Sequence, residues 1–207
     1  MSQFFQIHPQ NPQQRLIRQA VEIIRRGGVV AYPTDSCYAL GCAIEYKSAQ
    51  ERIRRIRRVD AKHNFTLVCR DLGEIATYAR VDNQIYRLLK TLTPGPYTFI
   101  LRATNEVPRR LQNPRRKTIG IRVPDNVIAQ ALCEELGQPL MSSTLILPDD
   151  DMPMTDPEDM REALEHQVEL VIDGGNCGLD PTTVLAFDEG DIEVRRHGVG
   201  AVDFLDD

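Results

Sequence analysis

The chain has 207 residues, of which 42% are hydrophobic, and its formal net charge is −5. This length and apolar fraction suffice for one sizeable core and fit a single domain over residues 1–207, whereas the negative charge argues against a general nucleic-acid binder. No apolar run approaches the ~20 residues that a membrane span needs, and the polar start lacks the basic and apolar regions of a secretion signal, so we expect a cytoplasmic protein with no membrane partner.

Helix and strand signals alternate along the first half of the chain. Asn11 and Pro12 are predicted to cap and start a helix that ends at Gly27-Gly28, and a buried strand follows at residues 29–32. Ser48 is predicted to cap a second helix, which carries arginines on its exposed side. The next predicted elements are a strand at 65–69, a short helix with a capping box from Asp71 to Glu74, a helix capped by Asp82, and a strand at 97–101.

The same alternation continues to the end of the chain. The predicted elements are a strand at 118–123, a helix from a cap at Asp125 to Gly137, a strand at 140–147, a helix starting within 155–158, and strands at 168–172, 182–187 and 192–196. This order predicts an α/β fold in which helices flank a twisted, open sheet.

Residues 32–42 form the most informative motif. The apolar strand before it ends at Tyr32, and Thr34, Asp35 and Ser36 follow at once. Loops fixed by a rigid strand and carrying short hydroxyls and a carboxylate are common binding and catalytic segments. The alternative interpretation is a polar connection between two strands.

Six segments, taken in order, resemble the motifs of the YrdC/YciO family, and the YciO-type branch is the closest match. Residues 32–42 resemble its P-T-[DE]-[ST]-x-Y-x-L-G opening, and residues 119–124 are similar to its V-A-V-R-x-P. The other matches are residues 93–101 with P-G-P-x-T-x-x-L, 139–144 with P-[LI]-x-x-x-S, 173–175 and 181–184 with D-G-G and S-T-[IV], and 196–198 with R-x-G. The resemblance implies a single-domain YrdC-like fold, a mixed sheet with a basic concave surface.

The resemblance also implies an activity and a site. Family members make threonylcarbamoyl-adenylate from threonine, bicarbonate and ATP for tRNA modification, so ATP with Mg²⁺ and an amino acid are the expected substrates. On the amino-acid side the matching residues are Thr34, Ser36, Arg122 and Thr182. On the nucleotide side they are Arg57, Thr118, Ser142, Thr144 and Arg196. Arg57 is an expected catalytic cation, and Lys62 is the second one if the longer loop that carries it folds back. For Arg122 an interstrand ion pair is the alternative.

Two departures from the family pattern fall on the nucleotide side. The family's K-x-R becomes Arg57-Arg58-Val59, and its S-A-N becomes Thr144-Leu145-Ile146. A planar arginine does not replace a compact lysine, and loss of one preorganised donor costs ~2.7–4 kcal/mol in a transition state. We therefore expect a synthase-like protein with reduced or altered activity. His63 is either a ligand contact of the altered loop or an exposed side chain.

Two other functions remain open. Seven basic residues against one acid in 52–70, and the same ratio in 102–122, favour a surface that binds tRNA or double-stranded RNA after the catalytic site has decayed. The residues expected on that surface are Arg54, Arg55, Arg58, Arg115 and Arg116. The third candidate is a nucleotide-dependent enzyme for a different small carboxylated substrate.

The sequence predicts no protein-ligated metal. The four histidines and five cysteines lack ligand spacing, and we expect the cysteines to be free and mostly buried. The run Asp149-Asp150-Asp151 is typical of a solvated turn, so magnesium is expected to arrive with ATP.

Overall fold

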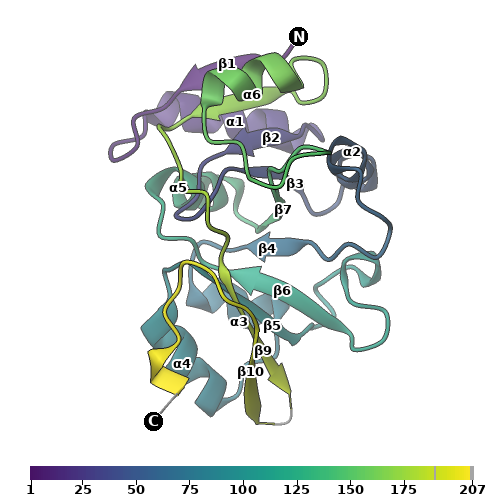
Figure 1. Ribbon diagram of the computed structural model, residues 1–207, viewed down its shortest axis with the longest axis vertical. Helices are drawn as coiled ribbons and strands as arrows, with labels where there is room; N and C mark the ends of the chain where they lie inside the picture. Colours follow the sequence, from purple (N-terminus) through teal and green to yellow (C-terminus); the bar gives the residue numbers. More distant parts are fainter. Residues whose placement is uncertain (189, 206–207) are drawn as a thin grey trace.

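One mixed sheet runs the length of the molecule, with the two termini at opposite ends (Figure 1). The computed structural model describes residues 1–188 and 190–205, and within them the sheet has ten strands in the order β1-β8-β2-β3-β7-β4-β6-β5-β9-β10. The strands are β1 (Gln3–Gln6), β2 (Val30–Tyr32), β3 (Ala39–Ala43), β4 (Thr66–Val68), β5 (Tyr97–Arg102), β6 (Thr118–Arg122), β7 (Leu140–Thr144), β8 (Leu170–Asp173), β9 (Thr183–Asp188) and β10 (Asp191–Arg196).

Parallel and antiparallel pairs alternate irregularly across this sheet. Strand β3 pairs antiparallel with β2 and β7, whereas β4 pairs parallel with β6 and β5 pairs parallel with β9. The predicted α/β fold with an open, mixed sheet is confirmed. Because β3, β7, β4 and β6 are neighbours in the middle, motifs far apart in the sequence come together there.

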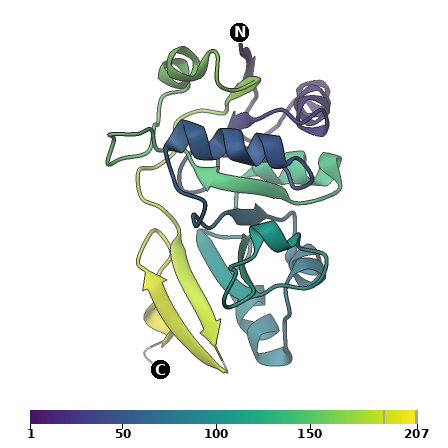
Figure 2. The same ribbon diagram turned by 90° about the vertical axis from the view of Figure 1, so that its right-hand side faces the viewer.

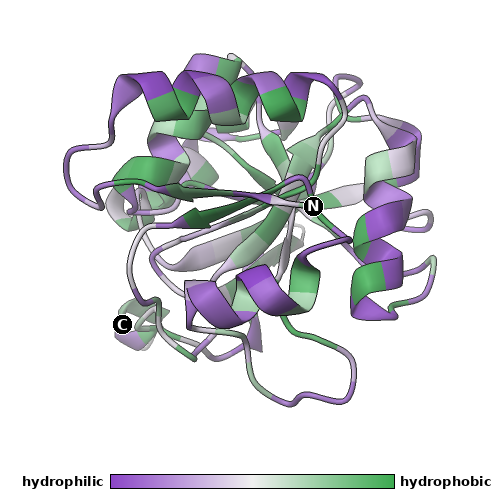
Figure 3. Cartoon of the chain, turned by 90° about the horizontal axis from the view of Figure 1, so that it is seen from above, coloured by the Kyte–Doolittle hydropathy of each residue, from purple (hydrophilic) through white to green (hydrophobic). Residues whose placement is uncertain are grey.

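Helices cover both faces of the sheet, as the view from above shows (Figure 3). They are α1 (Gln14–Arg25), α2 (Lys47–Arg57), α3 (Leu72–Tyr78), α4 (Asn83–Leu92), α5 (Val127–Leu136) and α6 (Pro157–Leu164), with short 3₁₀ turns at Arg109–Leu111 and Asp203–Leu205. Successive strand residues point to opposite faces. Thus Val30 and Tyr32 pack in one cluster with α1 and α5, while Ala31 packs in the other with α2, α3, α4 and α6.

Several predicted helix starts were wrong by one or two residues. Helix α1 follows Gln13 rather than the Asn11-Pro12 pair, and α2 follows Tyr46, which places Ser48 inside its first turn. Asn126, not Asp125, caps α5 by accepting the amide of Ala129. The amide of Asp125 instead donates to Asp35, 90 residues earlier in the chain.

The capping box at the start of α3 is only half formed. Asp71 accepts the amide of Glu74 at 2.8 Å, as predicted. The Glu74 carboxylate accepts the amide of Arg70, not that of Asp71. The prediction that Asp71 caps the helix is therefore confirmed. The predicted reciprocal hydrogen bond, from the Asp71 amide to the Glu74 carboxylate, is replaced by one from the Arg70 amide.

Candidate functional site

The loop between β2 and β3 is held by its own hydroxyls. Thr34 Oγ1 donates to the carbonyl of Cys37 at 2.6 Å and accepts the amide of Ser36 at 3.2 Å. Both hydroxyl residues are buried, and both line a cavity on the sheet. The loop is thus a rigid turn that presents short polar groups, as the first interpretation of the sequence requires.

Arg122, at the end of β6, contacts this loop directly. Its guanidinium forms an ion pair with the carboxylate of Asp35, and its Nη1 donates to Ser36 Oγ at 3.3 Å. The two charged side chains are 8% and 10% exposed, so the pair is buried. Arg122 Nε is buried and has no hydrogen-bond partner in the described part of the chain. The ion pair therefore leaves one donor of Arg122 unused.

The cavity beside this pair has a volume of about 600 Å³ and brings the predicted site residues together. Of the residues predicted to act on substrates, those that line it are Thr34, Ser36, Arg57, Thr118, Arg122, Ser142, Thr144, Thr182 and Arg196. Lys62 is exposed and does not line the cavity. The structure thus brings together every residue predicted for the amino acid and the nucleotide, but not the predicted second catalytic cation.

Charge in this cavity opposes the charge of the whole chain. Its described lining residues include five arginines and two aspartates: Arg57, Arg116, Arg122, Arg195 and Arg196, and Asp151 and Asp180. Two of these arginines are paired with carboxylates, Arg122 with Asp35 and Arg195 with Glu193, which leaves three without an ion pair among the described residues. A basic, concave site in a chain of net charge −5 concentrates positive potential where anions enter. The predicted basic concave surface corresponds to this cavity.

The two halves of the site meet at Thr182. Its hydroxyl lies 2.8 Å from that of Thr98, and it accepts a hydrogen bond from Arg196 Nη2 at 3.1 Å. Arg196 Nε also donates to the Thr182 carbonyl at 3.0 Å. The closing arginine, expected on the nucleotide side, therefore positions a hydroxyl expected on the amino-acid side.

Ser142 has a structural partner that the sequence did not indicate. Its hydroxyl lies 2.7 Å from the hydroxyl of Tyr32, which is fully buried. Burial raises the pKa of Tyr32 well above its ordinary value, so this phenol stays protonated. The bond ties the end of β2 to β7 beneath the cavity.

Two cavity residues were missed or misjudged from the sequence. Ser143 was not predicted, and His63, for which simple exposure was one interpretation, is half-buried and contacts both Arg57 and Ser143. Ile146, which stands where the family has the asparagine of S-A-N, lines the cavity. Val59, which stands where the family has the arginine of K-x-R, does not line it. Because successive strand residues point to opposite faces, the prediction of Ser142 gave no signal for Ser143.

The arginines predicted to bind RNA lie in different surroundings. Arg54 lies over the Phe65 ring at 4.7 Å, and Arg58 forms an exposed ion pair with Asp149 at 3.2 Å. Arg55 and Arg115 are exposed, and Arg116 is both exposed and part of the cavity lining. Arg54 is therefore less available to a ligand than its sequence position implies.

The cysteines agree with the prediction made from the sequence. All five cysteines are free and four are buried, as expected. In residues 1–188 and 190–205 no group of three or more acidic, histidine or cysteine side chains is placed to hold a metal ion. The helices in these ranges are too short or too polar to cross a membrane.

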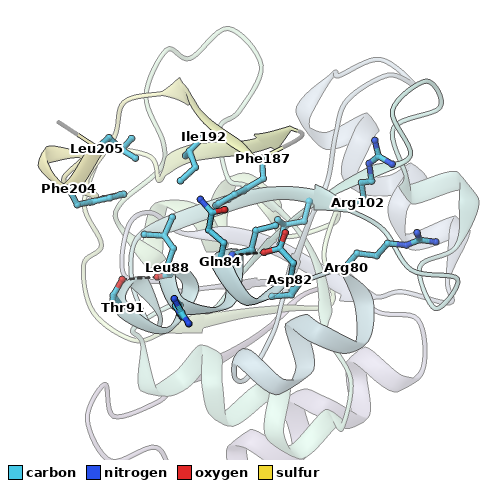
Figure 4. A pocket seen from close by; sticks show the side chains of 15 residues that line it. Arg80, Asp82, Gln84, Leu88, Thr91, Arg102, Phe187, Ile192, Phe204 and Leu205 are labelled. Carbon is cyan, nitrogen blue, oxygen red and sulfur yellow. Dashed lines mark hydrogen bonds between the residues drawn. The ribbon is translucent and has the colours of Figure 1, made fainter. Parts of the chain in front are cut away.

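A second, larger cavity of about 1130 Å³ lies between α4 and the β9–β10 hairpin. Figure 4 shows Leu88 of α4 near Phe187 and Ile192, with Phe204 at one end and Arg80 towards the other. The turned view in Figure 2 shows the hairpin at the C-terminal end of the molecule. None of the residues that the sequence analysis assigned to the amino acid or to the nucleotide lines this second cavity, so it is separate from the candidate site.

Comparisons with known proteins found relatives that match nearly the whole chain. A family model named Sua5_yciO_yrdC, with the description "Telomere recombination", matches residues 22–198. The uncharacterized protein YciO of Escherichia coli is 60% identical over 202 residues, 98% of each chain. A threonylcarbamoyl-AMP synthase of Nitrosococcus oceani is 36% identical over 129 residues, which are 62% of this chain and 69% of that protein.

Two solved structures share the fold. The crystal structure of E. coli YciO matches with a TM-score of 0.93 and 60% identity over 97% of this chain and 98% of that one. P. abyssi Sua5 in complex with L-threonine matches with a TM-score of 0.89 and 24% identity, over 98% of this chain and 59% of that one. The second likeness is one of fold.

Proposed function

This chain belongs to the Sua5–YciO–YrdC family, and from that premise we propose that it forms threonylcarbamoyl-adenylate from L-threonine, bicarbonate and ATP. In this reaction the amine of threonine forms a C–N bond with bicarbonate and water leaves. An oxygen of the resulting carbamate then attacks the α-phosphorus of ATP, a new P–O bond forms, and pyrophosphate leaves. Threonylcarbamoyl-AMP synthases among the relatives, and the threonine bound to the similarly folded Sua5, support this choice.

The single observation that carries the proposal is the geometry around Arg122. A buried guanidinium that lines the cavity next to the Ser36 hydroxyl suits the carboxylate of an amino acid. A charge-assisted hydrogen bond from arginine to carboxylate is about twice as strong as a neutral one. Asp35 holds the guanidinium in place and compensates its charge before the substrate arrives.

The nucleotide half of the proposal rests on the remaining arginines. Arg57 and Arg196 line the same cavity, and neither forms an ion pair with a carboxylate in the described residues. Such free guanidinium groups stabilise the negative charge that develops during phosphoryl transfer. Magnesium would enter with ATP, as its counterion.

We expect this reaction to be slow, because an amide donor is missing. Ile146 lines the cavity at the position of the asparagine in the family's S-A-N. Removal of one preorganised donor lowers kcat by about 10²–10³-fold. Exchange of Ile146 to Asn should therefore raise the rate, and addition of Val59→Arg should add little, since Val59 does not line the cavity.

The test is release of pyrophosphate from ATP that depends on both threonine and bicarbonate. Arg122→Lys keeps the charge but removes the fork of donors, and it should lower kcat/KM for threonine by 10-fold or more. Arg80→Lys makes the same chemical change at the second cavity and serves as the matched control. Absence of turnover at high enzyme concentration would remove this function, and turnover with another amino acid would identify a different substrate.

We propose RNA binding as a second function, because Arg116 is exposed and also lines the cavity. Arg115 and Arg116 stand on a turn whose amides are held by Asn113. Affinity for tRNA or double-stranded RNA should fall steeply with salt, and loss of both arginines should reduce the slope of log K against log salt by about 1.5. Salt-insensitive or undetectable binding would contradict this function.

A further inference from the structure

Three side chains of the cavity form a closed triangle of contacts. Arg57 Nη1 donates to Ser143 Oγ at 2.6 Å, His63 Nε2 lies 3.1 Å from the same oxygen, and Arg57 Nη1 lies 3.2 Å from His63 Nε2. Arg57 ends α2, His63 comes from the loop that follows it, and Ser143 belongs to β7. All three line the cavity.

The contacts agree with a neutral His63. A guanidinium can only donate, so a bond between Arg57 and His63 requires an unprotonated Nε2. The Ser143 hydroxyl then accepts from Arg57 and donates to His63. In this arrangement His63 is neutral, with its proton on Nδ1, and the one lone pair of Nε2 is shared by Arg57 and Ser143.

The surroundings of His63 favour this neutral form. Burial and the charges of Arg57 and Arg54 on α2 lower the pKa of His63 below its ordinary value, and Asp60 in the loop opposes them weakly. Phe65 packs against the imidazole with ring centroids 5.4 Å apart, and Ser143 on β7 is uncharged. With no anion present, an imidazolium would face an uncompensated arginine.

An oxyanion bound at this position would favour the protonated form of His63 over the neutral form. Arg57 and Ser143 can both donate to it, but a bare Nε2 would direct a lone pair at its negative oxygen. We propose that Arg57, His63 and Ser143 form an oxyanion subsite whose occupation by a phosphoryl or sulfate group is coupled to the uptake of a proton by His63. The proposal rests on the proposed function, in which the phosphates of ATP or pyrophosphate supply the oxyanion.

Further features of the cavity agree with an oxyanion there. Arg57 lines the cavity and forms no ion pair with a carboxylate among the described residues, so its charge is free to attract an oxyanion. By linkage, affinity for the oxyanion should fall up to tenfold per pH unit between the His63 pKa values of the free and occupied protein. The subsite would thus release its anion as pH rises.

The test uses sulfate, which does not titrate near neutral pH. Heats of sulfate binding are measured at pH 7 in buffers of different ionisation enthalpy, and their slope gives the protons taken up. We expect uptake in the wild type and in His166→Gln, an exposed histidine as matched control. His63→Gln should still bind sulfate, more weakly and without proton uptake.

A second measurement, made on the wild type, tests the proton coupling without relying on the His63→Gln variant. The titration of the His63 C2 proton, followed by NMR in the wild type, should shift to higher pH when sulfate is added. Sulfate binding without uptake or shift would overturn the proton coupling, and absence of sulfate and pyrophosphate binding would overturn the subsite. Neither readout needs threonine or turnover, so failure here is distinct from failure of the proposed synthesis.

Discussion

The buried pair between Arg122 and Asp35 gives the sharpest prediction for stability. In Arg122→Met the Asp35 carboxylate, only 10% exposed, loses its cation and keeps one amide donor from Asp125. Breaking a buried pair from one side costs about 3–5 kcal/mol. That is a large part of the 5–15 kcal/mol by which a typical domain is stable, and it lowers the ratio of folded to unfolded protein by roughly two to three and a half orders of magnitude.

The double variant Asp35→Asn with Arg122→Met distinguishes the loss of the ion pair from the loss of side-chain packing. Asp35→Asn alone should cost about 1.5–3 kcal/mol, because its amide oxygen can still accept from Arg122 but its NH2 group cannot accept from the Asp125 amide. In Asp35→Asn with Arg122→Met no charge is left buried, so the double variant should be more stable than Arg122→Met alone. We expect an interaction energy of about 2 kcal/mol between the two changes.

Urea unfolding, followed by circular dichroism with linear extrapolation, measures these free energies. Arg195→Met removes one partner of the exposed pair with Glu193 and should cost less than ~1 kcal/mol. A cost for Arg122→Met within about 1 kcal/mol of this control would refute the reasoning, as would strict additivity in the double variant. If Arg122→Met does not fold, recovery of folding by the double variant gives the answer.

Three further predictions concern other contacts of the site. Thr182→Val leaves the buried Thr98 hydroxyl without its partner and should cost about 1–3 kcal/mol and weaken threonine binding in calorimetry, whereas Thr183→Val, which loses a bond at 2.6 Å to the Gly200 carbonyl, should cost stability alone. Gly198→Ala would place its Cβ 2.2 Å from a carbonyl oxygen of the loop before Thr182, so both urea stability and threonine affinity should fall; unchanged values would mean that the loop relaxes freely. Because the pKa of His63 is lowered by folding, the unfolded chain takes up its proton first as pH falls, and stability should drop below pH ~6.5 more steeply in the wild type than in His63→Gln; equal slopes would contradict this.

The fold could be predicted where the pattern was local. Strand β2 and the caps Asp71 and Asp82 were predicted because a buried apolar run and a side-chain cap are visible within a few residues. Strands β3 and β1 were not predicted. The residues of β3 are buried on both faces, so it lacks the alternation of a half-exposed strand, and β1 is a four-residue strand at the edge of the sheet.

The residues that line the cavity could be predicted from the sequence, but the contacts between them could not. Ordered motifs identified the residues, whereas the contacts between Arg122 and Asp35, or between His63 and Ser143, join segments 80 or more residues apart. Such contacts depend on strand order, which places β7 beside β4 and β4 beside β6. Lys62 was a reasonable candidate by charge, but the turn at Asp60 places His63 rather than Lys62 in the cavity lining.

The two halves of the cavity differ in how their charges are compensated. Arg122 is paired with Asp35, whereas Arg57 and Arg196 contact neutral hydroxyls and form no ion pair in the described residues. The amino-acid half is therefore close to neutral, which suits a zwitterion, and the nucleotide half keeps positive charge, which suits a polyanion. Salt screens charges that are not locally paired, so the affinity for ATP or pyrophosphate should fall with ionic strength more steeply than the affinity for threonine.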